Sequence, residues 1–183
     1  PYLGAKIAQA IVEGFQGKTL GENNRSVAAC LKHYLGYGAA EGGRDYNTAE
    51  FSRTAMYNTY LPPFRAGVAA GAASVMTAFN VIDGVPAVAN KPLLEGVLRG
   101  ELGFDGVVIS DYSAVMELMM HGVAATPKEA AEKSLDAGLD IEMTTTYFKQ
   151  YGAEIGREHP ELLEKIDRAA ARVLTLKYRL GLM

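Results

Sequence analysis

Apolar residues follow two patterns along the chain, one typical of amphipathic helices and one typical of buried strands. Near the start, Leu3, Ile7, Ile11 and Phe15 recur at helical spacing before Gly17, which predicts an opening helix. Farther on, short apolar runs are each followed by a polar loop and a helical stretch. These runs are Val27–Leu31, Ser74–Phe79, Val107–Ile109 and Leu139–Met143. Such runs are typical of parallel strands covered by helices, so four β/α units are predicted.

Start and stop signals define the helices between these runs. The segment Thr126–Glu129 offers a capping box with proline in the first helical position, and Gly138 ends that helix. The pair Pro62-Pro63 fits only the first turn of a helix, because an interior proline breaks the hydrogen-bond ladder. The other predicted helices run from Pro62-Pro63 to Gly71, from Asn90 to Gly103, and from Pro160 to Leu180. The last of these carries one apolar stripe, which is expected to dock on the sheet.

The number of units limits the possible folds. Four β/α units are half of the eight that close a barrel, and a complete barrel usually needs about 250 residues. This chain has 183. Two architectures remain: an open four-stranded α/β sheet, or the second half of a (β/α)8 barrel whose first half lies outside the chain. Because the chain opens at Pro1 without an initiator methionine, we expect a processed or excised piece of a longer protein.

Composition excludes several classes of protein. With 49% hydrophobic and 21% charged residues the chain is expected to form an ordered core, not a disordered segment. A net charge of −3 gives no broad basic face, so neither nucleic acid nor an anionic membrane surface is an expected partner. No apolar stretch approaches the roughly 20 residues that a membrane span needs. The single cysteine, Cys30, lies in an apolar run and is expected to be a core thiol.

The segment after the first predicted strand is the densest in functional residue types. It carries Lys32, His33, Arg44 and Asp45 among several glycines. In α/β folds ligands bind beyond the carboxyl ends of the strands, so a site is expected there, although a solvated loop fits the spacing equally well. The glycines do not form a dinucleotide fingerprint, because Glu41 stands where a glycine is required.

Two carboxylates follow later strands. Asp111 comes at the end of the third apolar run, where it could cap the next helix or serve as a rigidly held nucleophile. A nearby cation, Lys32 or Arg44, would keep that carboxylate ionised. Glu142 ends the fourth run and is a weaker acid/base candidate, since strand alternation could turn it toward a helix. No histidine or cysteine spacing predicts a metal site, and no cofactor is expected.

Several motifs, in order, resemble glycoside hydrolase family 3, and in particular its bacterial periplasmic β-glucosidase branch. These motifs are Lys32-His33-Tyr34, Glu41–Asn47, Tyr60–Phe64, Ser74–Asn80, Val108–Tyr112 and Lys177–Leu182. The resemblance covers essentially the whole chain. It implies that residues 1–183 are the second half of the family's (β/α)8 catalytic barrel, and that the protein is periplasmic or secreted.

The resemblance also implies roles for individual residues. Asp111 corresponds to the nucleophile that forms a covalent glycosyl-enzyme intermediate, and Lys32 and His33 correspond to the pair that holds sugar hydroxyls. Met76 would line the same subsite, beside Phe79, where many members have tyrosine. Residues Arg44 and Asp45 lie within a matching motif and are expected to be substrate-binding. The implied reaction is retaining hydrolysis of terminal β-glucosyl residues of β-glucosides or oligosaccharides.

Part of the family's site has no counterpart in this chain. In β-glucosidase-type members the acid/base glutamate comes from a following domain, and an aspartate and an arginine come from the first barrel strands. We therefore expect either a catalytic half that works with the rest of the parent enzyme, or a non-catalytic half-barrel that associates with itself. A free-standing nucleotide-binding domain is a remote third alternative, and the sequence leaves glucosides and xylosides both open as substrates.

Overall fold

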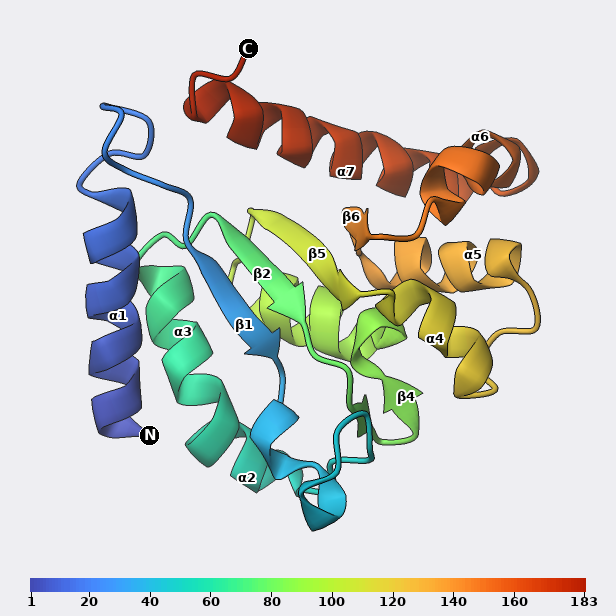
Figure 1. Ribbon diagram of the computed structural model, residues 1–183, viewed down its shortest axis with the longest axis horizontal. Coiled ribbons are helices and arrows are strands. Elements are labelled where there is room, and N and C mark those ends of the chain that lie inside the picture. The colour runs from blue at the N-terminus through green and yellow to red at the C-terminus, as the bar shows by residue number, and fades with distance from the viewer.

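A computed structural model describes all 183 residues as one parallel four-stranded sheet with helices around it (Figure 1). The strand order is β1-β2-β5-β6, which is also their order along the chain. The strands are β1 (Cys30–Tyr34), β2 (Ser74–Thr77), β5 (Val107–Tyr112) and β6 (Ile141–Met143). A small antiparallel hairpin, β3 (Val81–Ile82) and β4 (Val85–Pro86), follows β2.

Helical segments connect and cover the strands. The α-helices are α1 (Tyr2–Gln16), α2 (Arg53–Ala55), α3 (Leu61–Ala69), α4 (Ala114–Met120), α5 (Pro127–Ala137), α6 (Tyr147–Glu158) and α7 (Pro160–Arg179). Two segments are π-helical, η3 (Met56–Tyr60) and η5 (Pro92–Glu101), and three short 3₁₀ turns are η1 (Tyr37–Ala39), η2 (Glu41–Gly43) and η4 (Ala87–Ala89). In Figure 1, α1 and α3 lie beside β1, and α5, α6 and α7 lie toward β6.

The architecture is the predicted half of a (β/α)8 barrel. A doubly wound sheet reverses its strand order and carries helices on both faces, whereas here the order never reverses. The main core lies on one face of the sheet, where Val75 of β2 and Val108 of β5 pack with Leu94 of η5 and Val115 of α4. The opposite face, which would line a barrel interior, is left open.

Most predicted helices are confirmed by their caps. The Thr126 hydroxyl accepts from the Glu129 amide at 3.1 Å, and Glu129 Oε2 accepts from the Ala125 amide at 2.7 Å, as in a capping box. Asn90 Oδ1 accepts from the Leu93 amide, although the helix it opens is π-helical, not α-helical. Gly138 ends α5 in the left-handed conformation, with φ of 98°.

The proline pair is in the first turn of α3, as predicted. Helical turns nevertheless continue upstream, because α2 and the π-helical η3 run directly into α3. A π-helical turn suits this place, since Pro62 and Pro63 have no N–H to complete an α-helical ladder with that segment.

The first strand was predicted three residues too early, as Val27–Leu31 instead of Cys30–Tyr34. Pairing with β2 begins only at Cys30, opposite Ser74. Before it, the Ala29 amide donates at 3.0 Å to the buried side chain of Gln16, which also accepts from the Ala73 amide at 2.9 Å. This amide side chain ties the end of α1 to the starts of β1 and β2. A correct assignment places Lys32 and His33 within the strand, not in the loop that follows it.

The prediction that Cys30 is a core thiol is wrong, because Cys30 is exposed. It begins β1 on the open edge of the sheet, and it is Leu31, the next residue, that packs against the main core. Strand alternation thus turns Cys30 away from the helices. Separately, no helix in the structure is long and apolar enough to cross a membrane.

Candidate functional site

Asp111 lies near the carboxyl end of β5, and its carboxylate is held at both oxygens. Only 9% of the residue is exposed. Oδ1 accepts a hydrogen bond of 2.7 Å from the Tyr112 amide, and Oδ2 lies 3.3 Å from Nε2 of His33. A short carboxylate fixed this way on a strand has little freedom to rotate, which suits a group that must attack along one direction.

His33 reaches Asp111 across the intervening strand β2. The register between β1 and β2 shifts between Leu31 and Tyr34, and Lys32 and His33 lie in this irregularity. Burial lowers the pKa of His33, the charge of Lys32 lowers it further, and Asp111 opposes both. The imidazole is therefore neutral at pH 7, and its contact with Asp111 does not depend on a full ion pair. Two of the sequence candidates, His33 and Asp111, thus meet in the structure.

Met76 lies on β2, the strand between β1 and β5. Its register partner on β5 is Ile109, two residues before Asp111, and Met76 is 9% exposed. Its neighbour Val75 belongs to the helix-side core, so strand alternation directs Met76 to the open face. Farther along, Phe79 packs against two tyrosines, with ring centroids 4.4 Å from Tyr46 and 6.2 Å from Tyr37. Phe79, Tyr37 and Tyr46 thus form an aromatic cluster beyond the end of β2.

The loop residues Arg44 and Asp45 differ in how they are held. Asp45 Oδ1 accepts from the Tyr37 hydroxyl at 2.5 Å and from the Tyr46 amide at 3.1 Å. The bond to Asp45 raises the pKa of Tyr37 to about 12. Tyr37 in turn packs on His33, with ring centroids 5.0 Å apart, so Asp45 is linked to the Asp111 centre. Arg44 is exposed, and its side chain makes no hydrogen bond or ion pair, although its amide donates to the Glu41 carbonyl at 3.2 Å.

Glu142 is engaged elsewhere. Its carboxylate accepts from the Thr145 hydroxyl at 2.5 Å and from the Phe148 amide at 2.6 Å, which caps the start of α6. This geometry favours the alternative in which strand alternation turns Glu142 toward the helices.

Glu117 is a carboxylate near the site that the sequence reasoning missed. It lies in the first turn of α4, directly after β5, and burial raises its pKa with further contributions from Asp111 and Asp45. The available signal was its position one turn into the helix that follows the strand bearing Asp111. Its charge also raises the pKa of Tyr46, so Glu117 is part of the same electrostatic environment.

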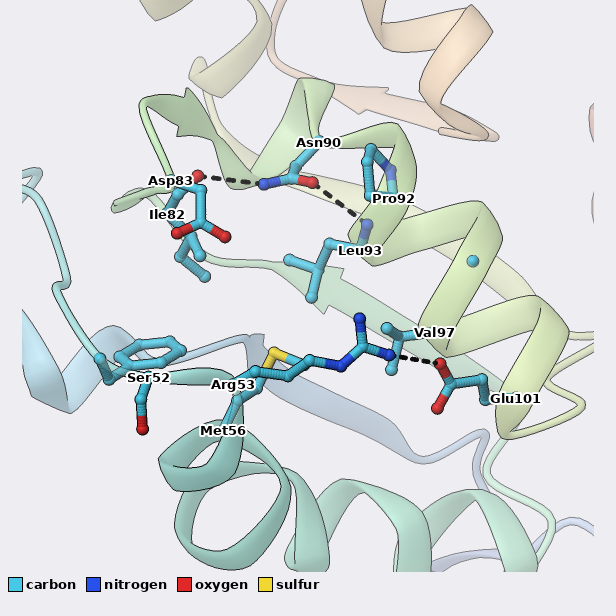
Figure 2. A pocket seen from close by; sticks show the side chains of 12 residues that line it. Ser52, Arg53, Met56, Ile82, Asp83, Asn90, Pro92, Leu93, Val97 and Glu101 are labelled. Carbon is cyan, nitrogen blue, oxygen red and sulfur yellow. Dashed lines mark hydrogen bonds and ion pairs between the residues drawn. The ribbon is translucent and has the colours of Figure 1, made fainter.

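Two cavities lie near this region, and the larger one does not include Asp111. A cavity of about 510 Å³ opens between η3, the β3–β4 hairpin and η5, with Asp83 at one end and the Arg53–Glu101 ion pair at the other (Figure 2). A smaller cavity of about 290 Å³ does touch the site. It is lined by Lys32, His33, Gly36, Tyr37, Gly38, Tyr60 and Phe64. Asp111 lines neither cavity, but His33, its partner, lines the smaller one.

One group of side chains has the spacing of metal ligands, far from Asp111. Ligand atoms of Glu132, Glu158 and His159 lie within 4.8 Å of one another on the side of α5 and α6. Lys128 already pairs with Glu158 at 2.5 Å, and these side chains are partly or fully exposed. Ion pairing therefore accounts for this cluster.

Comparisons with known proteins show the family of this chain. Residues 1–176 match the model of the Glycosyl hydrolase family 3 N terminal domain. The chain is 39% identical over 181 residues to the periplasmic beta-glucosidase of Salmonella typhimurium, covering 99% of this chain and 24% of that protein. It is 38% identical over 194 residues to a beta-xylosidase of Formosa agariphila, covering 100% and 27%.

A solved structure is similar throughout the chain. The crystal structure of a mutant beta-glucosidase from Listeria innocua in complex with laminaribiose superposes with a TM-score of 0.96 at 47% identity. The match covers 100% of this chain and 25% of that one. The chain thus spans about a quarter of the length of these relatives.

Proposed function

Because the chain belongs to glycoside hydrolase family 3, we propose that it supplies the nucleophile-bearing half of the catalytic barrel of a retaining β-glucosidase-type enzyme. The observation that carries this proposal is the contact of 3.3 Å between Asp111 Oδ2 and His33 Nε2 at the carboxyl ends of β5 and β1. Barrel active sites lie at that end of the strands. Family membership makes glycoside hydrolysis the chemistry to which this geometry is best suited.

The proposed reaction takes two displacements at the anomeric carbon. Asp111 attacks that carbon, a carbon–oxygen bond to the aspartate forms, and the bond to the leaving oxygen breaks while an acid protonates it. Water, deprotonated by the same group, then attacks the anomeric carbon and displaces the aspartate. Because each displacement inverts that carbon, the sugar is released with its original anomeric configuration. A retaining site sets the two carboxyl groups about 5–5.5 Å apart. We expect the acid/base from a following domain, since Glu142 caps α6.

The other site residues bind the sugar in this proposal. Lys32 donates hydrogen bonds to hydroxyl groups. Neutral His33 has a single N–H, so with Nε2–H directed at the Asp111 carboxylate its Nδ1 accepts a hydrogen bond from a sugar hydroxyl. Met76 packs against the sugar ring from β2. Asp45 holds the Tyr37 hydroxyl, and we expect it to bind substrate together with Arg44. No cofactor takes part in this reaction.

We propose that the rest of the parent enzyme completes the site and that the protein works in the periplasm or outside the cell. The relatives support both points, because the chain spans about a quarter of their length and one of them is named a periplasmic beta-glucosidase. The relatives include beta-glucosidases and a beta-xylosidase, so aryl β-glucosides and aryl β-xylosides are the substrates to compare.

Covalent trapping tests the nucleophile directly. The full-length protein is incubated with a 2-deoxy-2-fluoro-β-glucoside that carries a good leaving group, and its intact mass and peptide map are measured. An activated leaving group needs little help from the acid, so the test isolates Asp111 and its subsite. We expect one adduct per chain on Asp111 and none in Asp111→Asn. An adduct on another residue, or none on folded protein, would refute the proposal.

A second candidate is a non-catalytic half-barrel that associates with itself. It is favoured by one observation: the apolar face of α1 and the outer edges of β1 and β6 are uncovered in this chain. The trapping experiment on the full-length protein distinguishes the two, because a catalytic half is labelled at Asp111 once its site is complete, whereas a non-catalytic half-barrel forms no adduct.

A further inference from the structure

We propose that Ser110 is a positioning residue that holds the peptide group of Asp111 in place, an inference that rests on the proposed role of Asp111 as nucleophile. Ser110 directly precedes Asp111 in β5 and is fully buried. Its hydroxyl does not touch the open face. It acts through the backbone that carries the carboxylate.

The reason lies in a bulge of the sheet. Ile109 pairs with Ile141 and Tyr112 pairs with Met143, so three steps along β5 match two along β6. The intervening residues of β5 are Ser110 and Asp111. A bulge interrupts the regular ladder and re-aims a side chain, and bulges occur often beside active sites. Here the re-aimed side chain is the carboxylate of Asp111.

The Ser110 hydroxyl makes hydrogen bonds where the backbone ladder between β5 and β6 is interrupted. It accepts from the Met143 amide at 2.8 Å and donates to the Asp111 carbonyl at 2.8 Å. One side chain therefore joins β6 to the peptide group of the nucleophile. Removing it leaves the half-buried Met143 amide and the buried Asp111 carbonyl without this partner, which favours a shift of the bulge.

Ser113 and Thr144 join the ends of β5 and β6 just beyond the bulge. The Ser113 amide donates to the Met143 carbonyl and to the Thr144 hydroxyl, each at 3.1 Å. Ser113 and Thr144 both have left-handed backbones, with φ of 57° and 69°. Because these bonds persist without Ser110, the loss of its hydroxyl should move Asp111 without unfolding the sheet.

The test compares two buried serines in the full-length protein. Ser110→Ala removes the bridging hydroxyl, whereas Ser134→Ala removes a fully buried hydroxyl on α5 that has no hydrogen-bond partner. Each variant is labelled with the 2-deoxy-2-fluoro-β-glucoside, and two quantities are measured: the fraction of chains labelled at completion and the rate constant of labelling. Partial misfolding lowers the fraction, while a displaced carboxylate lowers the rate constant.

We expect Ser110→Ala to lower the labelling rate constant roughly 10- to 100-fold, because a displacement of about 1 Å in a reacting group can cost about 100-fold in rate. The affinity for the unreacted glycoside and the final labelled fraction should stay close to wild type. Ser110→Thr, which keeps the hydroxyl, should recover part of the rate, and Ser134→Ala should match wild type. Amide exchange of the 141–146 segment should accelerate in Ser110→Ala only.

The outcomes separate this inference from the proposed function. Normal labelling of Asp111 in wild type, with equal rate constants in Ser110→Ala and Ser134→Ala, would overturn the positioning role alone. A lower labelled fraction with an unchanged rate constant would do the same, since it reports folding. If wild type is not labelled at Asp111, the proposed function fails, and the positioning role falls with it.

Discussion

At the scale of single residues, the hydrogen bond from Tyr37 to Asp45 changes the ionisation of a tyrosine that packs on His33. The bond raises the pKa of Tyr37 to about 12, because a phenol that donates to a carboxylate resists losing its proton. A folded-state pKa above the unfolded value of about 10 stabilises the fold below pH 10. This contribution is lost as the pH rises from about 10 to 12.

Asp45→Asn should therefore return the pKa of Tyr37 toward about 10. The measurement is an NMR titration of ring-labelled tyrosine, with the Tyr37 signal assigned from Tyr37→Phe. Glu41→Gln, an exposed acidic residue of the same loop, is the matched control and should leave the titration unchanged. If Tyr37 titrates alike in wild type and Asp45→Asn, the bond does not hold the loop in solution.

At the scale of elements, one buried carboxylate joins the sheet to two helical segments. Asp140, immediately before β6, accepts from Arg99 of η5 at 2.7 Å, from Arg172 of α7 at 2.9 Å and from the Val108 amide at 2.7 Å. Its side chain is 1% exposed. Asp140→Asn keeps the shape but leaves two guanidinium groups without their anion, one of them deeply buried.

We expect Asp140→Asn to lower the free energy of unfolding by roughly 3 kcal/mol, since breaking a buried ion pair leaves an uncompensated charge. Urea denaturation followed by circular dichroism measures it. Asp136→Asn is the control, because Asp136 also pairs with two cations, Lys91 and Lys165, but is 40% exposed. Its expected cost is about 1 kcal/mol or less. Similar costs for both variants would show that the Asp140 cluster does not join these elements.

Helices with local signals could be predicted from the sequence, whereas features that depend on distant residues could not. The patterns predicted a site at the carboxyl ends of the strands, but they named Lys32 or Arg44 as the neighbour of Asp111, where the structure has His33. Strand runs and caps leave local signals, so the helix that begins at Thr126 followed from pattern alone. The start of β1 did not, because a side chain 14 residues upstream, Gln16, takes the amide hydrogen bond that would have continued the strand. Sequence alone also gave no signal for the bulge at Ser110, which depends on the register with β6.

At the scale of the whole molecule, the chain leaves apolar surface and strand edges uncovered. Leu3, Ile7, Ile11 and Phe15 form one exposed stripe along α1, while the opposite side of that helix packs on α3. The outer edges of β1 and β6 have no strand partner. Unpaired edges and contiguous apolar surface promote association, either with the missing half of a barrel or with a second copy.

We therefore expect the isolated 183-residue chain to self-associate at micromolar concentration, as measured by size-exclusion chromatography with light scattering. Placing charge in the stripe, with Ile7→Lys and Ile11→Lys together, should shift the distribution toward monomer because lysine is costly to bury at an interface. Gln9→Lys, on an exposed polar position of the same helix, should leave it unchanged. A stable wild-type monomer would show that the uncovered stripe does not drive association. Equal association of the stripe variant and wild type would instead assign the association to the strand edges.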